Sequence, residues 1–152
     1  MKKFEKYCSI ILGIMLSGKL LGILGFNVFF VLFAFILSLF YFFCSFPLIT
    51  GERFGTLLRS NVSKILKFKS VVFGYGLFLL IIGIVYVVQH WIGGFRYLIS
   101  GLVICSLLWL NALVCLKRKI DLSVNEQIFN RTLIFLIFGI IALSYKLFVN
   151  NY

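Results

Sequence analysis

The chain has 152 residues, of which 62% are hydrophobic and only 12% are charged. A small soluble domain leaves much of its surface in water and typically carries about 25% charged residues, so this composition excludes an ordinary soluble fold. The formal net charge of +11 does not indicate a nucleic-acid binder. Such a protein would present a soluble basic face or a platform of stacking aromatics, and the polar segments here are too short to form either.

Five apolar segments are long enough to cross a bilayer, whose ~30 Å hydrocarbon core needs about 20 mainly apolar residues per helix. In chain order they cover residues 7–24, 28–46, 70–89, 97–116 and 132–149. Unpaired backbone groups are very costly in lipid, and the alternating pattern of a membrane barrel is missing, so we expect helices. The second span is expected to stop at Pro47. The fifth could instead lie along the membrane surface, which would leave the C-terminus inside.

The spans divide the chain into alternating hairpins and basic loops. The expected units are a first hairpin (1–50), a basic cytoplasmic loop (51–69), a second hairpin (70–116), a second basic cytoplasmic loop (117–131), and a fifth helix with a tail (132–152). The clustered basic residues are Lys2, Lys3, Lys6, Arg53, Arg59, Lys64, Lys67, Lys69, Lys117, Arg118, Lys119 and Arg131. Because cytoplasmic loops collect Lys and Arg, the N-terminus is predicted to be inside.

The predicted location is therefore the bacterial cytoplasmic (inner) membrane, crossed several times, with a cytoplasmic N-terminus. We expect the N-terminal segment to be an uncleaved anchor rather than a signal peptide, because it continues directly into a tight turn and a second span. The lipid bilayer is then the main partner, and the basic loops should attract anionic lipid headgroups. Only Lys19, Arg96 and Lys146 fall outside the basic clusters.

The two hairpins share a hinge, at residues 19–25 and again at 87–93, an offset of 68 positions. The hinge glycines are Gly22, Gly25, Gly93 and Gly94. A reversal of a few residues between helices needs positive φ or a close backbone approach, which glycine allows. The predicted fold class is all-α, a polytopic membrane helix bundle of two repeated helical hairpins plus a C-terminal helix. A chance match between two apolar runs is the alternative explanation of the repeat.

Small residues spaced four apart predict seams where helix backbones approach closely. The pairs are Gly18 with Gly22, Ala34 with Ser38, Ser70 with Gly74, and Gly101 with Cys105. Asn111, deep in the fourth span, is expected to form a hydrogen bond to another helix. Together these residues predict a compact bundle with a seam for a second copy or for other membrane subunits.

A candidate polar cluster on the outer face consists of Lys19, His90, Trp91 and Arg96. It could form a protonatable or ligand-binding site. The alternative is that Trp91 belongs to the interfacial aromatic belt, that His90 caps its helix, and that Lys19 snorkels to the headgroups.

A single histidine without a nearby carboxylate predicts no metal site, and we expect no cofactor. The cysteines, Cys8, Cys44, Cys105 and Cys115, are expected to behave as small hydrophobic residues.

No catalytic grouping, phosphate-binding glycine loop or pair of carboxylates is present, and the inner loops are too short for a catalytic domain, so we expect no enzyme. The leading hypothesis is a non-enzymatic scaffold or accessory subunit of a membrane complex. The alternative is a small transporter or channel component. Its polar route would use the five candidates Lys19, Asn27, His90, Arg96 and Asn111.

The second hinge contains the sequence Gln89-His90-Trp91-Ile92-Gly93-Gly94, preceded by Gly83-Ile84-Val85-Tyr86. It resembles a hairpin of GldL-type gliding-motility membrane proteins of the Bacteroidota and their smaller relatives. The pattern of that hairpin is Gly-x-x-Phe-Lys-x-x-His-Trp-Pro-Gly-Ala. The first unit is similar at Lys19, Leu20, Leu21, Gly25 and Asn27. The resemblance covers about residues 10 to 115 and implies a shared hairpin architecture.

Several positions depart from that pattern. The proline of the family is Leu24 and Ile92 here, its histidine is Gly22 in the first unit, and its lysine is Val87 in the second. The family's motor protein carries a carboxylate inside its membrane helices, whereas the four acids of this chain, Glu5, Glu52, Asp121 and Glu126, lie outside the predicted spans. A role as an ion-driven motor subunit would therefore need an acid from another chain.

Overall fold

The computed structural model describes residues 2–20, 26–50 and 64–150, and nearly all of these are helical. The helices are α1 (Lys2–Leu20), α2 (Phe26–Thr50), α3 (Lys64–Val88), α4 (Gly94–Lys117) and α5 (Leu122–Asn150). The described part of the chain contains no strand. The all-α prediction is confirmed.

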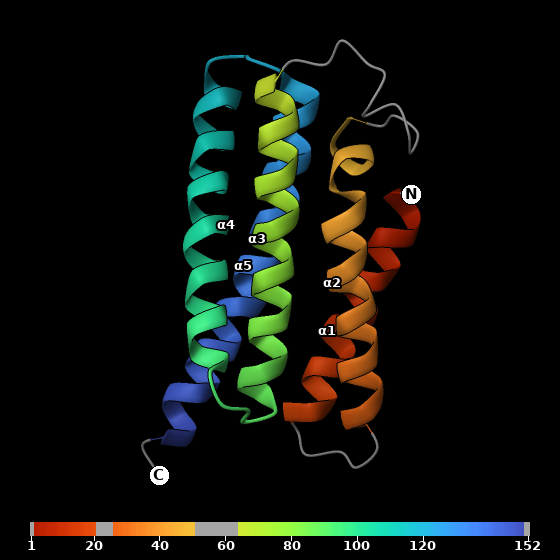
Figure 1. Ribbon diagram of the computed structural model, residues 1–152, viewed down its shortest axis with the longest axis vertical. Coiled ribbons are helices and arrows are strands. Elements are labelled where there is room, and N and C mark those ends of the chain that lie inside the picture. The colour runs from red at the N-terminus through yellow and green to blue at the C-terminus, as the bar shows by residue number, and fades with distance from the viewer. Residues whose placement is uncertain (1, 21–25, 51–63, 151–152) are drawn as a thin grey trace.

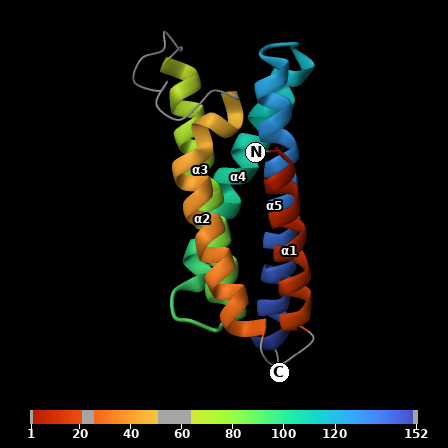
Figure 2. The same ribbon diagram turned by 90° about the vertical axis from the view of Figure 1, so that its right-hand side faces the viewer.

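The five helices run up and down in one elongated bundle (Figure 1). Helix α3 lies at its centre and packs against α2, α4 and α5. Of the 18-residue apolar stretch of α3, 67% is buried, against 22% for α4. Helix α1 lies beside α2 and α5 at the periphery (Figure 2), where Phe138 of α5 approaches Gly13. The connection between α3 and α4 lies at one end of the bundle, and the connection between α4 and α5 at the other.

Four helices are long and apolar enough to cross a membrane, namely α2, α3, α4 and α5. The chain is accordingly a multi-pass integral membrane protein with apolar helices that contact the bilayer. In α1 the apolar stretch is shorter and covers only Ile10–Lys19. The predicted first span continued to residue 24, and residues 21–25, which include Gly22 and Gly25, lie outside the described ones.

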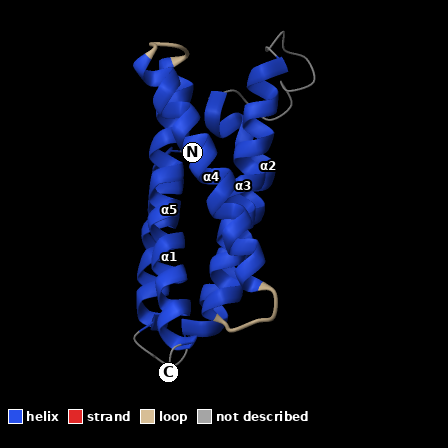
Figure 3. Cartoon of the chain, turned by 90° about the vertical axis from the view of Figure 1, so that its left-hand side faces the viewer, coloured by secondary structure: helices blue, strands red, loops and turns tan. Residues whose placement is uncertain are grey.

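Helix α5 begins ten residues earlier than the predicted fifth span, at Leu122 instead of residue 132. Most of the second predicted loop, 117–131, is therefore helical, and the described turn is confined to residues 118–121. The polar residues of this extension continue the helix beyond its apolar part. Helix α5 also packs along α3 and α4 (Figure 3), which excludes the alternative of a helix lying apart from the bundle on the membrane surface.

The expected stop at Pro47 is wrong for the helix, because α2 continues through Pro47 to Thr50. Proline lacks a backbone N–H and leaves the carbonyl four residues earlier without its usual donor. Near a helix end this loss is small, and side chains can satisfy freed groups. Two other carbonyls in the last turns of α2 have side-chain donors: the Thr50 hydroxyl donates to Phe46 at 2.9 Å, and Arg131 of α5 donates to Leu48 at 3.0 Å.

Glycines bring α3 and α4 into backbone contact. A Cβ on Gly101 of α4 would lie 2.5 Å from the Cα of Leu80 on α3, and a Cβ on Gly83 of α3 would collide with the backbone of Leu98 on α4. Gly76 makes a similar approach to Ile104, where a Cβ would lie 2.7 Å from Cγ2. Such distances are closer than any side chain permits, so glycine is required along this seam.

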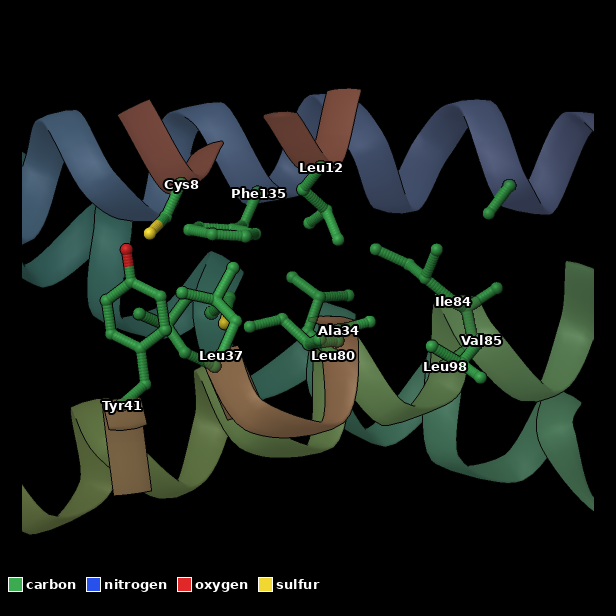
Figure 4. Close-up of a cluster of buried hydrophobic side chains, with 14 of the residues drawn as sticks. Cys8, Leu12, Ala34, Leu37, Tyr41, Leu80, Ile84, Val85, Leu98 and Phe135 are labelled. Atoms are coloured by element: carbon green, nitrogen blue, oxygen red, sulfur yellow. The ribbon is translucent and has the colours of Figure 1, made fainter. Parts of the chain in front are cut away.

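Aromatic and aliphatic side chains from four helices meet around Tyr41, which is fully buried. The ring of Tyr41 packs edge-on against Phe135 of α5, with centroids 5.3 Å apart, and against Phe73 of α3 at 6.5 Å. Figure 4 shows its hydroxyl directed toward the sulfur of Cys8 on α1. This cluster joins α1 and α2 to the rest of the bundle.

The described helix boundaries keep the offset of the predicted repeat. Helix α1 ends at Leu20 and α3 at Val88, and α2 begins at Phe26 and α4 at Gly94, so each pair differs by 68 positions. The packing is less regular, because α3 and α4 are in far closer contact than α1 and α2. An internal repeat remains a prediction.

Candidate functional site

The turn between α3 and α4 contains the predicted hinge and ends α3 with a Schellman motif. The Trp91 N–H donates to the Tyr86 carbonyl at 2.8 Å, and the His90 N–H donates to the Val87 carbonyl at 3.1 Å. His90 has φ 57°, the left-handed conformation that such a motif requires at this position. Glycine usually supplies it, and a histidine there costs about 1–2 kcal/mol. The backbone is therefore strained at His90.

The two glycines of this turn have different roles. Gly93 has φ 84° and precedes the first residue of α4, and a Cβ added there would meet no described atom within 4 Å. Gly94 is buried, and a Cβ there would lie 2.8 Å from the carbonyl carbon of Tyr86. Positive φ thus requires glycine at the first position, and close contact with α3 requires it at the second.

His90 contacts α5 rather than the other members of the predicted cluster. Its Nε2 lies 3.4 Å from the hydroxyl of Tyr145, and the two ring centroids are 6.0 Å apart. Both groups can donate or accept, so either the hydroxyl or the imidazole supplies the proton. The sequence analysis did not identify Tyr145. The contact joins the end of α3 to the last turns of α5.

The four residues of the predicted polar cluster lie toward the same end of the bundle, namely Lys19, His90, Trp91 and Arg96. No described hydrogen bond joins any two of them. Trp91 instead packs edge-on against Tyr86, with centroids 5.0 Å apart, and is half exposed. Arg96 is exposed and Lys19 is partly buried. This arrangement fits an aromatic belt and snorkelling cations as well as it fits a binding site.

An apolar groove lies between α2 and this turn. It has a volume of about 430 Å³, and its walls include Val31 and Phe35 of α2. Asn27, Trp91 and Gln89 also line it. The side-chain nitrogen of Gln89 is buried and has no hydrogen-bond partner. Among the described residues this amide nitrogen therefore has no acceptor, and a buried amide without a partner costs about 1–3 kcal/mol.

The opposite end of the bundle, here called the basic end, comprises residues 64–69, 117–119 and Arg131. Arg131 of α5 donates from Nη1 to the Leu48 carbonyl at 3.0 Å and to Oε1 of Gln127 at 3.1 Å. Leu48 is in the last turn of α2, where carbonyl groups lack helical partners. A cation there also interacts favourably with the helix dipole.

The α4–α5 turn repeats the Schellman geometry of the hinge. The Ile120 N–H donates to the Cys115 carbonyl at 3.0 Å and the Lys119 N–H to the Leu116 carbonyl at 3.1 Å. Lys119 has φ 58°. Asn125 fixes this turn from α5, because its buried amide nitrogen donates to the Ile120 carbonyl at 2.8 Å.

Three buried serine and threonine hydroxyls are bonded within their own helices. Ser38 donates to the Phe35 carbonyl at 2.8 Å, Ser70 to Leu66 at 2.8 Å, and Thr132 to Ile128 at 2.7 Å. Within the described ranges, no three His, Cys, Asp or Glu residues lie close enough to hold a metal ion. The described interior is therefore a packed apolar core with locally satisfied hydroxyls.

Most of the predicted packing residues are buried, and Asn111 is not. The buried ones within the described part of the chain are Gly18, Ala34, Ser38, Ser70, Gly74, Gly101 and Cys105. Gly22 lies outside it. Asn111 is exposed, and its Oδ1 accepts a contact from the Cys115 sulfur, 3.8 Å away on the same helix. It therefore does not occupy the cross-helix position expected for it.

The closest contacts of α3 with α4 were missed by the sequence analysis. Gly76 and Gly83 are seven residues apart, as are Gly94 and Gly101. Seven residues are close to two helical turns, so each pair lies on one face of its helix. A search for seven-residue spacing would have identified them, whereas a four-residue spacing includes only Gly101 with Cys105.

Comparisons of the chain with models of protein families, with curated proteins and with solved structures give no match.

Proposed function

We propose that this protein is a non-enzymatic scaffold or accessory subunit of a membrane complex. The Gln89 amide, which lacks a described partner and lines an apolar groove, carries the proposal, because its side chain can turn into the groove and donate to an acceptor on a neighbouring transmembrane helix. The exposed apolar side chains of α2 beside the groove, Val28, Leu32 and Phe35, offer that helix an apolar surface. Helix association in lipid depends on such packing together with interhelical hydrogen bonds.

The polar candidates for a transport route do not favour a transporter or channel component. Asn27, His90, Arg96 and Asn111 are exposed, and they lie at the periphery of the bundle. The buried hydroxyls of Ser38, Ser70 and Thr132 are bonded within their own helices. No described carboxylate lies in the interior, because Asp121 and Glu126 are exposed. An ion-driven motor role would likewise need a partner's acid.

The proposed setting is the bacterial inner membrane with the N-terminus in the cytoplasm. The basic end of the bundle supports this orientation through the positive-inside tendency. The basic end is proposed to attract anionic headgroups. A relationship to the GldL-type proteins is likewise proposed, on the hinge residues alone.

Affinity purification from native membranes in mild detergent tests the scaffold role. We expect stoichiometric membrane partners with the unmodified chain, and Gln89→Leu should lower their recovery several-fold while the bundle stays folded. Asn130→Leu is the matched control, because it removes an exposed amide far from the groove. A monomeric, partner-free protein would contradict the scaffold proposal, and equal partner recovery with Gln89→Leu would exclude the groove.

A further inference from the structure

A second groove lies between α3 and α4 at the basic end. Its apolar walls include Ile65, Phe68 and Val72 of α3 and Leu107 and Leu108 of α4, and its volume is about 340 Å³. Ile65 and Phe68 are each 70% exposed, so the groove opens toward the surroundings of the bundle. For a helix pair that spans a membrane, those surroundings are lipid.

Two polar residues, Lys69 and Asn111, line the same groove. Lys69 is partly buried, and its Nζ lies 3.7 Å from the sulfur of Cys115 on α4. Within the described residues this thiol is the one partner of the ammonium. Sulfur is a weak acceptor, whereas an ammonium is strongly hydrated and is stabilised by an anion when water is excluded. No anionic partner of this lysine is found among the residues that the structure describes.

The position of Lys69 corresponds to the headgroup region. It lies five residues after Lys64, the first residue of α3, which is about 8 Å along the helix axis. Lys117 ends α4 at the same end of the bundle. An apolar groove that begins beside a cation at this depth matches one kind of molecule, an amphiphile with a negatively charged head and a hydrocarbon chain.

We propose that this groove binds an anionic phospholipid of the surrounding bilayer, with one acyl chain along the α3–α4 walls and its phosphate beside the Lys69 ammonium. Charge complementarity selects the head, and the exposed apolar walls accept the chain. This proposal rests on the proposed attraction of the basic end to anionic headgroups. It goes further by naming the groove in which one such lipid binds. It is separate from the scaffold role, which concerns the groove at the hinge end.

Native mass spectrometry of the full chain from detergent, titrated with phosphatidylglycerol or phosphatidylcholine, measures this binding. We expect preferential retention of phosphatidylglycerol, and a loss of about five-fold in its affinity with Lys69→Gln, from the usual contribution of one basic residue. Lys67→Gln is the matched control, because it removes the same charge two residues away, about 200° around the helix. It should leave most of the preference intact, and Lys69→Arg should retain it.

The apolar part of the site is tested with a second matched pair. Val72→Phe fills the groove and should lower retention of both lipids, whereas Val71→Phe adds the same ring at an exposed neighbour that does not line it. Circular dichroism checks that each variant is folded. Lys69→Arg keeps the positive charge at this position. If Lys69→Gln loses binding while Lys69→Arg retains it, and both are folded, the loss is due to the missing charge.

Three outcomes would overturn the site in distinguishable ways. Equal losses with Lys69→Gln and Lys67→Gln would show diffuse attraction to the basic end and exclude this groove. Equal effects of Val72→Phe and Val71→Phe would exclude the chain position. If phosphatidylglycerol and phosphatidylcholine bind the unmodified chain equally, the proposed attraction to anionic headgroups fails as well.

Discussion

Arg131 of α5 donates a hydrogen bond to the carbonyl oxygen of Leu48 at 3.0 Å, across 83 positions of the chain. The bond joins the last turn of α2, just beyond Pro47, to a helix with which α2 otherwise makes few contacts. It also supplies a cation where the carbonyls of a helix end lack partners.

Replacing this arginine should destabilise the bundle. We expect Arg131→Ala to lower the free energy of unfolding by about 1–2 kcal/mol, because a hydrogen bond from a charged donor is lost and the Leu48 carbonyl is left without it. Thermal unfolding in detergent, followed by circular dichroism, measures the change. Lys117→Ala removes an exposed charge at the same end and should have little effect. Equal melting temperatures for the two variants would contradict the role of Arg131.

The glycine seam between α3 and α4 should not tolerate a methyl group. Gly101→Ala is expected to cost about 1–3 kcal/mol, because the new Cβ would overlap the Leu80 backbone and force the helices apart. Gly13→Ala is the control, since a Cβ there meets only the ring end of Phe138, at 3.1 Å. The two melting temperatures should therefore differ clearly, and a Gly101→Ala protein as stable as the Gly13→Ala one would refute the close approach.

The left-handed residue in the α4–α5 turn provides a stabilising substitution. Lys119→Gly should raise the unfolding free energy by about 1 kcal/mol, because glycine adopts positive φ without the steric penalty of a side chain. Lys117→Gly, within the last turn of α4, should instead lower it by up to about 1 kcal/mol. Opposite shifts in melting temperature are the expected result, and shifts of the same sign would show that the turn differs from the one described.

Replacing the left-handed residue of the α3–α4 turn, His90, by glycine should have two opposing effects on the unfolding free energy. His90→Gly also relieves positive φ, but it removes the imidazole that contacts the Tyr145 hydroxyl. Tyr145→Phe removes the same contact and leaves the strain in place. We therefore expect His90→Gly to be more stable than Tyr145→Phe by about 1–2 kcal/mol, the cost of a left-handed residue. Thermal unfolding of the two variants measures this difference, and equal stability would show that His90 carries no strain.

Much of the fold follows from the sequence because lipid imposes strict limits on it. Apolar segments near 20 residues must be helical, and basic segments must lie at their ends, so α2 and α4 fall close to the predicted ranges, whereas α3 begins at Lys64, six residues before its predicted span. The stop at Pro47 was wrong because the proline lies three residues before the end of α2, where the loss of one helical hydrogen bond costs little. The start of α5 was missed because its first turns are polar, and hydropathy identifies only the apolar part of a helix.

The candidate site was less predictable. His90 is conspicuous in the sequence, yet its partner Tyr145 is 55 positions away and depends on how α5 packs. The sequence likewise gives no indication that the Gln89 amide is buried without a partner, since burial depends on neighbouring helices.

By itself the sequence determined that this is a helical membrane protein, because its composition and the lengths of its apolar segments suit only lipid. It also placed Gly93 and Gly94 at the turn between two helices. Only the tertiary structure decided that α3 is the central helix, that glycines seven residues apart bring α4 against it, and that Lys69 faces a groove with a thiol as its neighbour. These features arise from contacts between distant segments, whose geometry hydropathy and spacing along the chain do not contain.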